Sequence, residues 1–371
     1  MNDDIFTGGL PVGMSNTNRN RLLGVIAVIL GIGALRASYS VTMPLAAAAV
    51  VIAAVWPVKT WADRYLPAGL GYAATVATLA VVFAAFTVAV YFCAAQVVFA
   101  FERDWDRFNV LYLRFAQWGE LWGWPLDGQE AYGRLIGAAR GLLQNVYATL
   151  AYLGFIALLV TFGLPEVPAL RIKLRETFTR DEQRKVLEAV EDIAVKTRQY
   201  LGISTLTSLL TGVATTLLAL AVGLDLALVW GVLNFLLNYI PVVGNVIGIL
   251  PPSLYAFMQF QTATTPAFVL VGLTVIQLAI SNVVYPMLQG RSLSLSPLAI
   301  IVALSFWSWV WGIAGAILAV PLSSAIVIAC EAFPSTRWIA RLLSEPEERK
   351  GWLARRPKGG GRQATSGEDG D

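Results

Sequence analysis

Long stretches without a charged residue constrain this chain more than any other feature of its sequence. No Asp, Glu, Lys or Arg occurs among the 65 residues between Asp225 and Arg291, and five further uncharged stretches hold 22, 37, 25, 26 and 39 residues. A helix needs about 20 apolar residues to cross a bilayer. Only 14% of the chain is charged, whereas soluble proteins carry about a quarter. The sequence therefore predicts an all-α, polytopic integral membrane protein, built as a helical bundle.

Eight spans account for the apolar stretches. The 65-residue stretch is long enough for two of them, and the polar run at 259–266 (QFQTATTP) divides it. Several stretches exceed the length that a bilayer requires, so tilted or kinked helices are expected. We place the spans near residues 22–38, 41–58, 70–100, 146–163, 202–222, 226–258, 264–286 and 296–329.

The distribution of basic residues predicts the orientation, because cytoplasmic loops are richer in Lys and Arg. With the N-terminus inside, 20 of the 27 basic residues fall in cytoplasmic segments and seven fall outside. We therefore expect both termini to be cytoplasmic. The predicted organisation is a cytoplasmic segment at 1–20, three spans at 21–100, an extracytoplasmic amphipathic helical region at 101–145, a fourth span at 146–163, a charged cytoplasmic helical region at 164–201, a four-span core at 202–330, and a cytoplasmic tail at 331–371 that is disordered from about residue 344.

Missing residues and motifs exclude most enzyme classes. The chain has no histidine, which rules out zinc sites of the H-E-x-x-H kind and Ser-His or Cys-His catalytic pairs. It also lacks the G-x-x-x-x-G-K-[ST] motif of nucleotide-driven pumps. Cys93 and Cys330 lie in apolar stretches and are predicted to be buried thiols. We expect no enzymatic activity, cofactor, metal site or nucleic-acid partner; the expected partners are membrane lipid and a small-molecule solute.

The segment 238–252 holds three prolines and two glycines within 15 uncharged residues, which does not suit one straight helix. A spanning helix tolerates a break where its backbone lines a watery cavity or is packed in protein. Two half-helices meeting near 241–245 would expose carbonyl and N–H groups to a solute; the alternative is a proline kink whose asparagines bind helices together. The candidate substrate-pathway residues here are Asn234, Asn238, Pro241, Gly244, Asn245, Gly248 and Pro251.

The following span carries polar residues at helical spacing and ends in a proline. These residues are candidates for the opposite wall of the same pathway. Hydrogen bonding between helices explains them equally well. They are Gln277, Ser281, Asn282 and Pro286.

A possible internal repeat links two of the predicted spans. Val229-Trp230-Gly231 is followed by Pro241, and Val310-Trp311-Gly312 is followed by Pro321. Paired interrupted helices are typical of transporters built from repeats. The pattern rests on four residues, so chance is the alternative.

Several motifs in the second half of the chain occur together. Tyr200-Leu201 precedes a Ser/Thr/Gly-rich helix, and I-P-x-x-G-x-x-x-G begins at Ile240. They are followed by S-N-V-V-Y-P at 281–286, L-S-P-L at 295–298, and W-G-I-A-G at 311–315, which leads to A-V-P-L at 319–322. Over residues 185–330 this set resembles the autoinducer-2 exporter family, also described as PerM-like permeases.

The resemblance implies eight spans in a bacterial inner membrane, no known enzymatic activity, and export of small solutes such as the quorum signal autoinducer-2. Some members of that family are described as sodium or lithium/proton antiporters. Oligomeric assembly is described within the family, so the resemblance implies a homo-oligomer. Residues 101–145 and the tail match none of its motifs.

Three functions remain open on the sequence. The first is an exporter or facilitator of a small, polar, uncharged solute, such as an autoinducer-2-like signal. The second, a sodium or lithium/proton antiporter, requires a titratable group within the membrane, and the candidates for ion coupling are Asp225, Glu166 and Glu331, at the ends of the uncharged stretches. Asp225 lies in the turn 223–226, where capping of the next helix is its alternative role. The third function is a non-transporting membrane scaffold.

Overall fold

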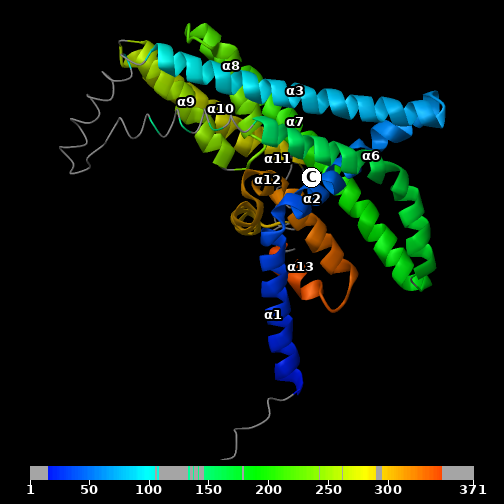
Figure 1. Cartoon of the computed structure of the whole chain (residues 1–371). Coiled ribbons are helices and arrows are strands. Elements are labelled where there is room, and N and C mark those ends of the chain that lie inside the picture. Colours follow the sequence, from blue (N-terminus) through cyan, green and yellow to red (C-terminus); the bar gives the residue numbers. More distant parts are fainter. Residues whose placement is uncertain are drawn as a thin grey trace, which may run out of the picture.

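The computed structural model describes residues 16–104, 107, 133, 137, 141, 146–177, 179–241, 243–260, 262–289 and 295–344. The predicted helices at 101–145 and the predicted disorder beyond 344 lie largely outside these residues. The all-α fold class is confirmed for the described part of the chain. Its elements are α1 (Asn16–Ala37), α2 (Tyr39–Tyr65), α3 (Ala68–Arg103), α6 (Val146–Thr177), α7 (Arg180–Ala221), α8 (Ala227–Leu237), α9 (Val243–Gln259), α10 (Thr264–Ala279), the π-helix η1 (Ile280–Val284), α11 (Tyr285–Gln289), α12 (Pro297–Ala332) and α13 (Arg337–Leu343) (Figure 1).

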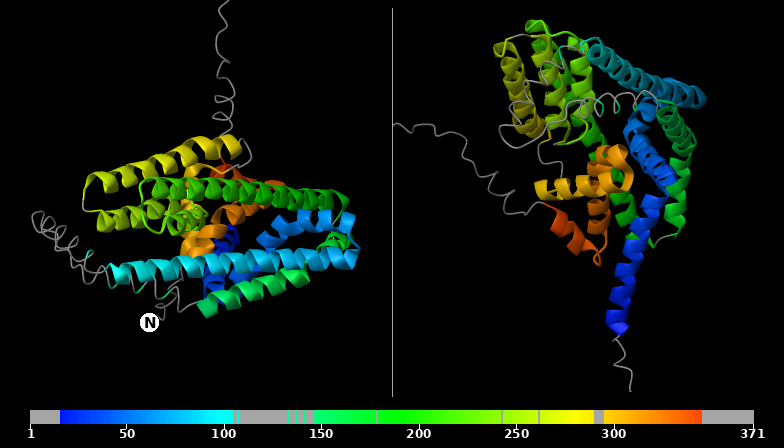
Figure 2. Two further views of the ribbon diagram at one scale, coloured as in Figure 1. Left: turned by 90° about the horizontal axis from the view of Figure 1, so that it is seen from above. Right: turned by 60° about the vertical axis from the view of Figure 1, so that its left-hand side comes forward.

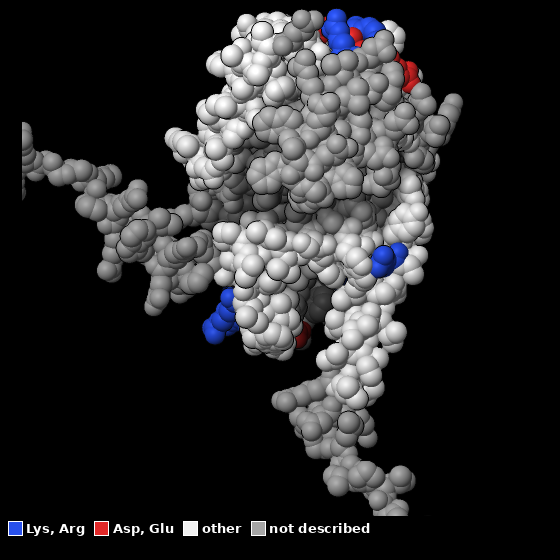
Figure 3. All heavy atoms as spheres, turned by 90° about the vertical axis from the view of Figure 1, so that its left-hand side faces the viewer, with Lys and Arg blue, Asp and Glu red and all other residues white. Residues whose placement is uncertain are grey.

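Among the described residues, six helices are long and apolar enough to cross a membrane, which confirms a polytopic bundle. They are Tyr39–Tyr65, Gly69–Ala100, Leu150–Leu174, Arg180–Ala221, Thr264–Gln289 and Pro297–Ala332. The first predicted span is a shorter apolar helix, Leu22–Ala37, and α1 extends away from the other helices (Figure 2, right). On the face drawn in Figure 3 the charged side chains form a few small groups, and most of the described surface carries none. Such a surface suits contact with lipid tails.

The fourth and fifth predicted spans continue without a break into the charged region at 164–201. α6 extends to Thr177 and α7 begins at Arg180, so the two helices meet in a short turn. A capping box begins α7: the backbone N–H and the hydroxyl of Thr179 donate to the Glu182 carboxylate at 3.3 and 2.8 Å. α7 packs against α2, α6, α8, α10 and α12. It is therefore the central helix of the bundle.

The predicted span at 226–258 is corrected by the structure, because it folds into two antiparallel helices. Asn234 of α8 donates to the carbonyl of Gly248 in α9 at 3.0 Å. In one straight helix these residues would stand about 21 Å apart. The rings of Trp230 and Tyr255 also meet, 5.5 Å apart. The predicted break is present, but it reverses the chain, and we call residues 227–259 the α8–α9 hairpin.

The last predicted span is broken as well. Trp311 and Gly312 interrupt α12, and Gly312 has a φ of 63°, which a side chain disfavours. The Trp307 indole N–H donates to Ser323 Oγ at 3.1 Å, although a straight helix would separate the two residues by about 24 Å. α12 therefore bends sharply there. Since Trp230-Gly231 lies inside α8 and Trp311-Gly312 forms a bend, the proposed repeat has no structural counterpart.

Both ends of the α8–α9 hairpin lie at the same end of the bundle. Gln259 closes the hairpin by accepting from the Asp225 backbone N–H at 2.8 Å and donating to the Gly223 carbonyl at 2.7 Å. Arg103, at the end of α3, lies 3.7 Å from the Asp225 carboxylate. The other end of α7 lies beside Glu331 and Arg337, where these residues line a shared crevice. The hairpin therefore does not carry the chain from one end of α7 to the other.

We expect single cysteines at Thr262 and Ser335 to be labelled from opposite faces of intact cells, in a chain whose Cys93 and Cys330 are replaced by alanine. Thr262 follows Gln259, which is bound to the turn beside Asp225, whereas Ser335 lies near the start of α7. A cysteine at Asp225 is the matched control and should be labelled from the same face as Thr262. Labelling of Thr262 and Ser335 from one face would mean that 226–258 crosses the membrane after all.

Candidate functional site

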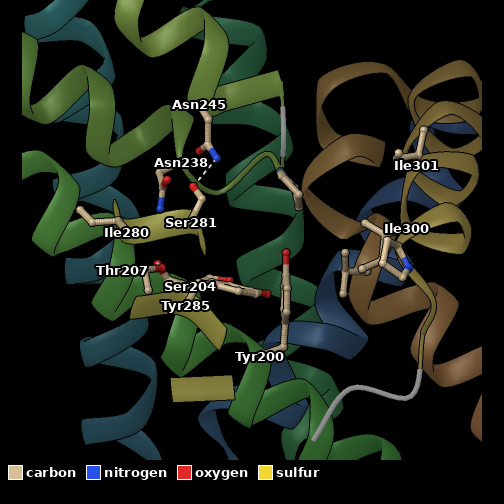
Figure 4. Close-up of a pocket in the computed structure, with 13 residues that line it drawn as sticks. Tyr200, Ser204, Thr207, Asn238, Asn245, Ile280, Ser281, Tyr285, Ile300 and Ile301 are labelled. Carbon is tan, nitrogen blue, oxygen red and sulfur yellow. Dashed lines mark hydrogen bonds between the residues drawn. The ribbon is translucent and has the colours of Figure 1, made fainter. Parts of the chain in front are cut away.

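A cavity of about 240 Å³ lies between α7, the tip of the α8–α9 hairpin, η1 and the two parts of α12. Figure 4 shows the polar side chains on one side of it and the Ile300–Ile301 pair of α12 on the other. None of the described residues that line it carries a charge. The lining consists of Tyr200, Ser204, Thr207, Asn238, Pro241, Asn245, Ile280, Ser281, Tyr285, Pro297, Ile300, Ile301 and Val320.

α7 supplies the polar wall of the cavity. Tyr200, Ser204 and Thr207 share one face of the helix through their spacing of four and three residues. All three are buried in the bundle. Thr207 donates to the carbonyl of Ile203, in its own helix, at 2.9 Å. A hydroxyl satisfied in this way can still accept a hydrogen bond from a solute.

The hairpin tip holds two asparagines at the cavity. Asn238 donates to Ser208 Oγ of α7 at 3.0 Å, and Asn245 donates to Ser281 Oγ of η1 at 2.6 Å. Figure 4 shows the second bond as a dashed line above the hydroxyl groups of α7. Each asparagine donates through its amide N–H to α7 or η1, and among the described side chains around the cavity none donates to its amide oxygen. The tip is thus held by side chains that also border the open space.

The π-helix η1 turns Ser281 and Tyr285 toward the cavity. The Tyr285 N–H donates to the Ile280 carbonyl, five residues earlier, and the next residue, Pro286, has no N–H to continue an α-helix. Single π turns inside α-helices occur often at functional sites. Pro286 is itself exposed. The position of Pro286 therefore indicates that it shapes the backbone of this wall and does not contact the solute.

Four of the eleven predicted pathway residues line the cavity, and a second group lies deeper in the hairpin. Asn234 is almost fully buried and donates to the carbonyls of Trp230 and Gly248, while Gln277 donates to Asn234 Oδ1 at 3.0 Å. These contacts match the alternative interpretation, in which polar residues join helices. The four residues at the cavity are Asn238, Pro241, Asn245 and Ser281.

The remaining predicted residues are explained by packing or lie at the surface. A Cβ on Gly244 would collide with the carbonyl of Leu237, and one on Gly248 would collide with the Asn234 amide. Both glycines therefore allow α9 to lie against α8. Pro251 lies within α9, half-buried, and Asn282 is exposed and donates to its own helix at Leu278.

The three candidates for ion coupling lie at the surface, away from the cavity lining. Glu166 is exposed on α6, and Glu331 borders the crevice near Arg337. Asp225 does not cap α8, because Leu226 is the N-cap residue and has no side-chain cap. The Asp225 carboxylate faces Arg103 instead. A hydrogen bond with Asp104 raises the pKa of Arg103, so its guanidinium stays charged beside the carboxylates of Asp104 and Asp225.

Sequence reasoning missed Tyr200, Ser204, Thr207 and Tyr285 as site residues. The signal was present in α7, where buried small polar residues recur at helical spacing. The motif of Tyr200-Leu201 before a Ser/Thr/Gly-rich helix overlaps this stripe, but the sequence does not show that the stripe faces α8 and α12. Its members are Thr197, Tyr200, Ser204, Thr207, Ser208, Thr211 and Thr215.

Comparisons with known proteins match most of the chain. Residues 25–335 match the profile described as AI-2E family transporter. The chain is 34% identical over 214 residues to the AI-2 transport protein TqsA of Escherichia coli K12, with 56% of this chain and 61% of TqsA covered. It is 33% identical over 212 residues to a Haemophilus influenzae protein assigned only provisionally as a transport protein, with 57% and 59% covered. The chain thus spans about three fifths of the length of these relatives.

Proposed function

Because the chain belongs to the AI-2E family of transporters, we propose that it moves a small, polar, uncharged solute across the bacterial inner membrane, as an exporter or facilitator. The observation that carries this proposal is the cavity between α7, the hairpin tip and α12. Seven of its lining side chains bear a hydroxyl or amide group, and none bears a charge. Placing polar residues inside the membrane costs free energy, and residues kept there in spite of this cost mark solute pathways. Their gathering around one open space is what a carrier of a polar solute requires.

The lack of charge in the lining decides which solutes are favoured. Moving an ion from water into a site without an opposite charge costs far more than moving a neutral polar molecule. Hydroxyl and amide groups can replace the water that a neutral polyol or carbonyl compound gives up. A volume of about 240 Å³ limits the solute to a small molecule. The name of TqsA refers to AI-2, and a solute of that class is our first choice for this chain.

The proposal predicts that transport does not depend on a titrating carboxylate. We expect Asp225→Asn, Glu166→Gln and Glu331→Gln each to reduce the flux of labelled autoinducer-2 into proteoliposomes by less than about tenfold, because proton coupling needs a group that changes charge along the pathway. Flux should also change little between external pH 6 and 8 with the membrane potential clamped. The three side chains lie outside the cavity lining.

The opposite outcome is equally well defined. Counterflow of protons with sodium or lithium, abolished by one of the three substitutions, would replace the facilitator by an antiporter. Lys59→Ala in the Lys59–Asp63 pair of α2 is a suitable control, since that charge also lies outside the cavity lining. Its loss should leave both kinds of flux unchanged.

A further inference from the structure

The short helix α13 lies beside the start of α12, which lines the cavity. After α12 ends at Ala332 the chain turns, and Thr336 Oγ1 donates to the Cys330 carbonyl at 3.0 Å. α13 then packs back against α12 (red-orange in Figure 2). Its last residue, Leu343, accepts from the Ser296 N–H at 3.0 Å, and Ser344 pairs with Leu295 in an antiparallel bridge. We call residues 333–344 the strap.

The strap holds the segment that begins the α12 wall of the cavity. Ser296 caps α12 by accepting from the Ala299 N–H at 3.2 Å, and Pro297, which follows it, lines the cavity. Whatever holds Leu295 and Ser296 therefore also sets the position of Pro297 and Ile300. In the described part of the chain, the backbone contacts recorded for Leu295 and for the Ser296 N–H are those to the strap.

A buried apolar cluster under the strap forms the floor of the cavity. Ala340 of α13 is 0% exposed and packs in this cluster with Leu295 and Ala299. Two other members, Tyr200 and Val320, also line the cavity. The strap thus contributes a side chain to the layer that borders the cavity on this side.

A charged crevice of about 260 Å³ lies on the other side of that layer. On α7 the crevice residue Asp192 is eight residues from Tyr200, and on α12 the crevice residue Ile328 is eight residues from Val320. Eight helical residues correspond to about 12 Å. Arg337, the first residue of α13, borders the crevice as well. Cavity and crevice are therefore separated by two helical turns of α7 and α12 and by the strap.

The strap is held by fewer contacts than α7 and α12, the long helices that border the cavity. It contains a helix of seven residues, which is too short to persist without tertiary contacts. Within the described part of the chain its outer side is exposed, with Trp338 62% and Leu342 72% exposed. By contrast, α7 is buried in the bundle from Thr197 onward, and α12 packs against α1, α2 and α7.

From this arrangement we propose that the strap is the gate of the cavity on the crevice side. Release of α13 removes Ala340 from the floor and frees Leu295–Pro297, which opens the cavity to the crevice. The gate would serve the proposed transport function, and in that respect this proposal rests on it. Its test, however, measures access to the cavity and does not require transport.

The test uses Leu295→Cys with Ser344→Cys, in a chain whose Cys93 and Cys330 are replaced by alanine. Cα atoms of an antiparallel bridge lie about 4.5–5.5 Å apart, a separation that a disulfide accepts. Ser204→Cys reports access to the cavity. Membrane vesicles that expose a Ser335→Cys control are treated with a membrane-impermeant maleimide, and modification of residue 204 is followed by peptide mass spectrometry.

We expect oxidation of the pair to slow modification of residue 204 by about tenfold, as a shift of the open population requires, and reduction to restore it. Leu295→Cys and Ser344→Cys alone are the matched controls and should show no effect of oxidation. Equal rates in the oxidised and reduced states would overturn the proposal. Slower modification in the oxidised state supports the gate even if the protein moves no autoinducer-2, so the two proposals fail separately.

A second pair of variants tests release of the strap. Ala340→Glu places a carboxylate in the apolar floor, where its burial is unfavourable, and should speed modification of residue 204 by about threefold or more through a larger open population. Leu342→Glu adds the same charge on the exposed side of α13 and should leave the rate unchanged. Equal rates in the two variants, at equal abundance, would contradict the proposed gate.

Discussion

Ser204→Trp is expected to abolish solute flux while the protein still inserts and folds. Ser204 is buried on the α7 wall of the cavity. An indole ring there would fill much of the space of about 240 Å³ that a solute must enter. The ring grows into an existing void, so the destabilisation that follows overpacking, about 1–3 kcal/mol, should stay near the lower end. The measurement is the flux of labelled autoinducer-2 in proteoliposomes. We expect this flux to fall about 100-fold, which corresponds to a transport barrier higher by about 2.7 kcal/mol.

Leu206→Trp is the matched control for this substitution. Leu206 lies two residues along the same helix and is exposed, so the added ring meets lipid and not the cavity. Its flux should equal that of the unchanged protein at equal abundance. Normal flux through Ser204→Trp would show that solute does not pass through this cavity.

Gly244→Ala is expected to destabilise the protein more than a methyl group normally does. The new Cβ would collide with the Leu237 carbonyl, a backbone atom that cannot rotate away. α9 must then move from α8, which disturbs the nearby bond between Asn245 and Ser281. The cost of such overpacking is about 1–3 kcal/mol, and the hairpin tip that lines the cavity shifts with it. Thermal unfolding in detergent and flux per folded molecule should both decrease.

Gly154→Ala provides the comparison for that loss. Gly154 is also a helical glycine, in α6, and a Cβ built on it meets nothing within 4 Å. Alanine there should leave stability and flux unchanged or slightly improved, since it favours the helix. Equal stability of the two variants would contradict the close contact between α8 and α9.

Much of the fold follows from hydrophobicity and breakers in the sequence. Uncharged stretches predicted the apolar helices, and the prolines and glycines of 238–252 predicted the interruption between Leu237 and Val243. The direction of the chain after that interruption was not predictable. A proline removes one hydrogen bond and one conformation, and both a kink and a reversal satisfy that constraint.

The candidate site shows the same division. Asn234 and Asn238 lie four residues apart on one helical face, and their spacing predicted a shared role. The hairpin separates them: α9 covers Asn234, whereas Asn238 at the tip reaches α7 and the cavity. That these two and the other predicted residues carry solute stays a prediction.

By itself, the sequence determined that the chain is helical, lies in a membrane and has a polar, uncharged set of residues near its proline-rich break. These properties depend on residue type and local spacing, which the chain displays directly. Only the tertiary structure decided that 226–258 returns to its starting end, and that Tyr200, Ser204 and Thr207 face Asn245, Ser281 and Ile300 across one cavity. It also decided that the strap binds the backbone of Leu295 and Ser296 at the start of α12. Such contacts join residues far apart in the chain, and each helix face has several possible neighbours of equal polarity, so packing of the whole bundle selects among them.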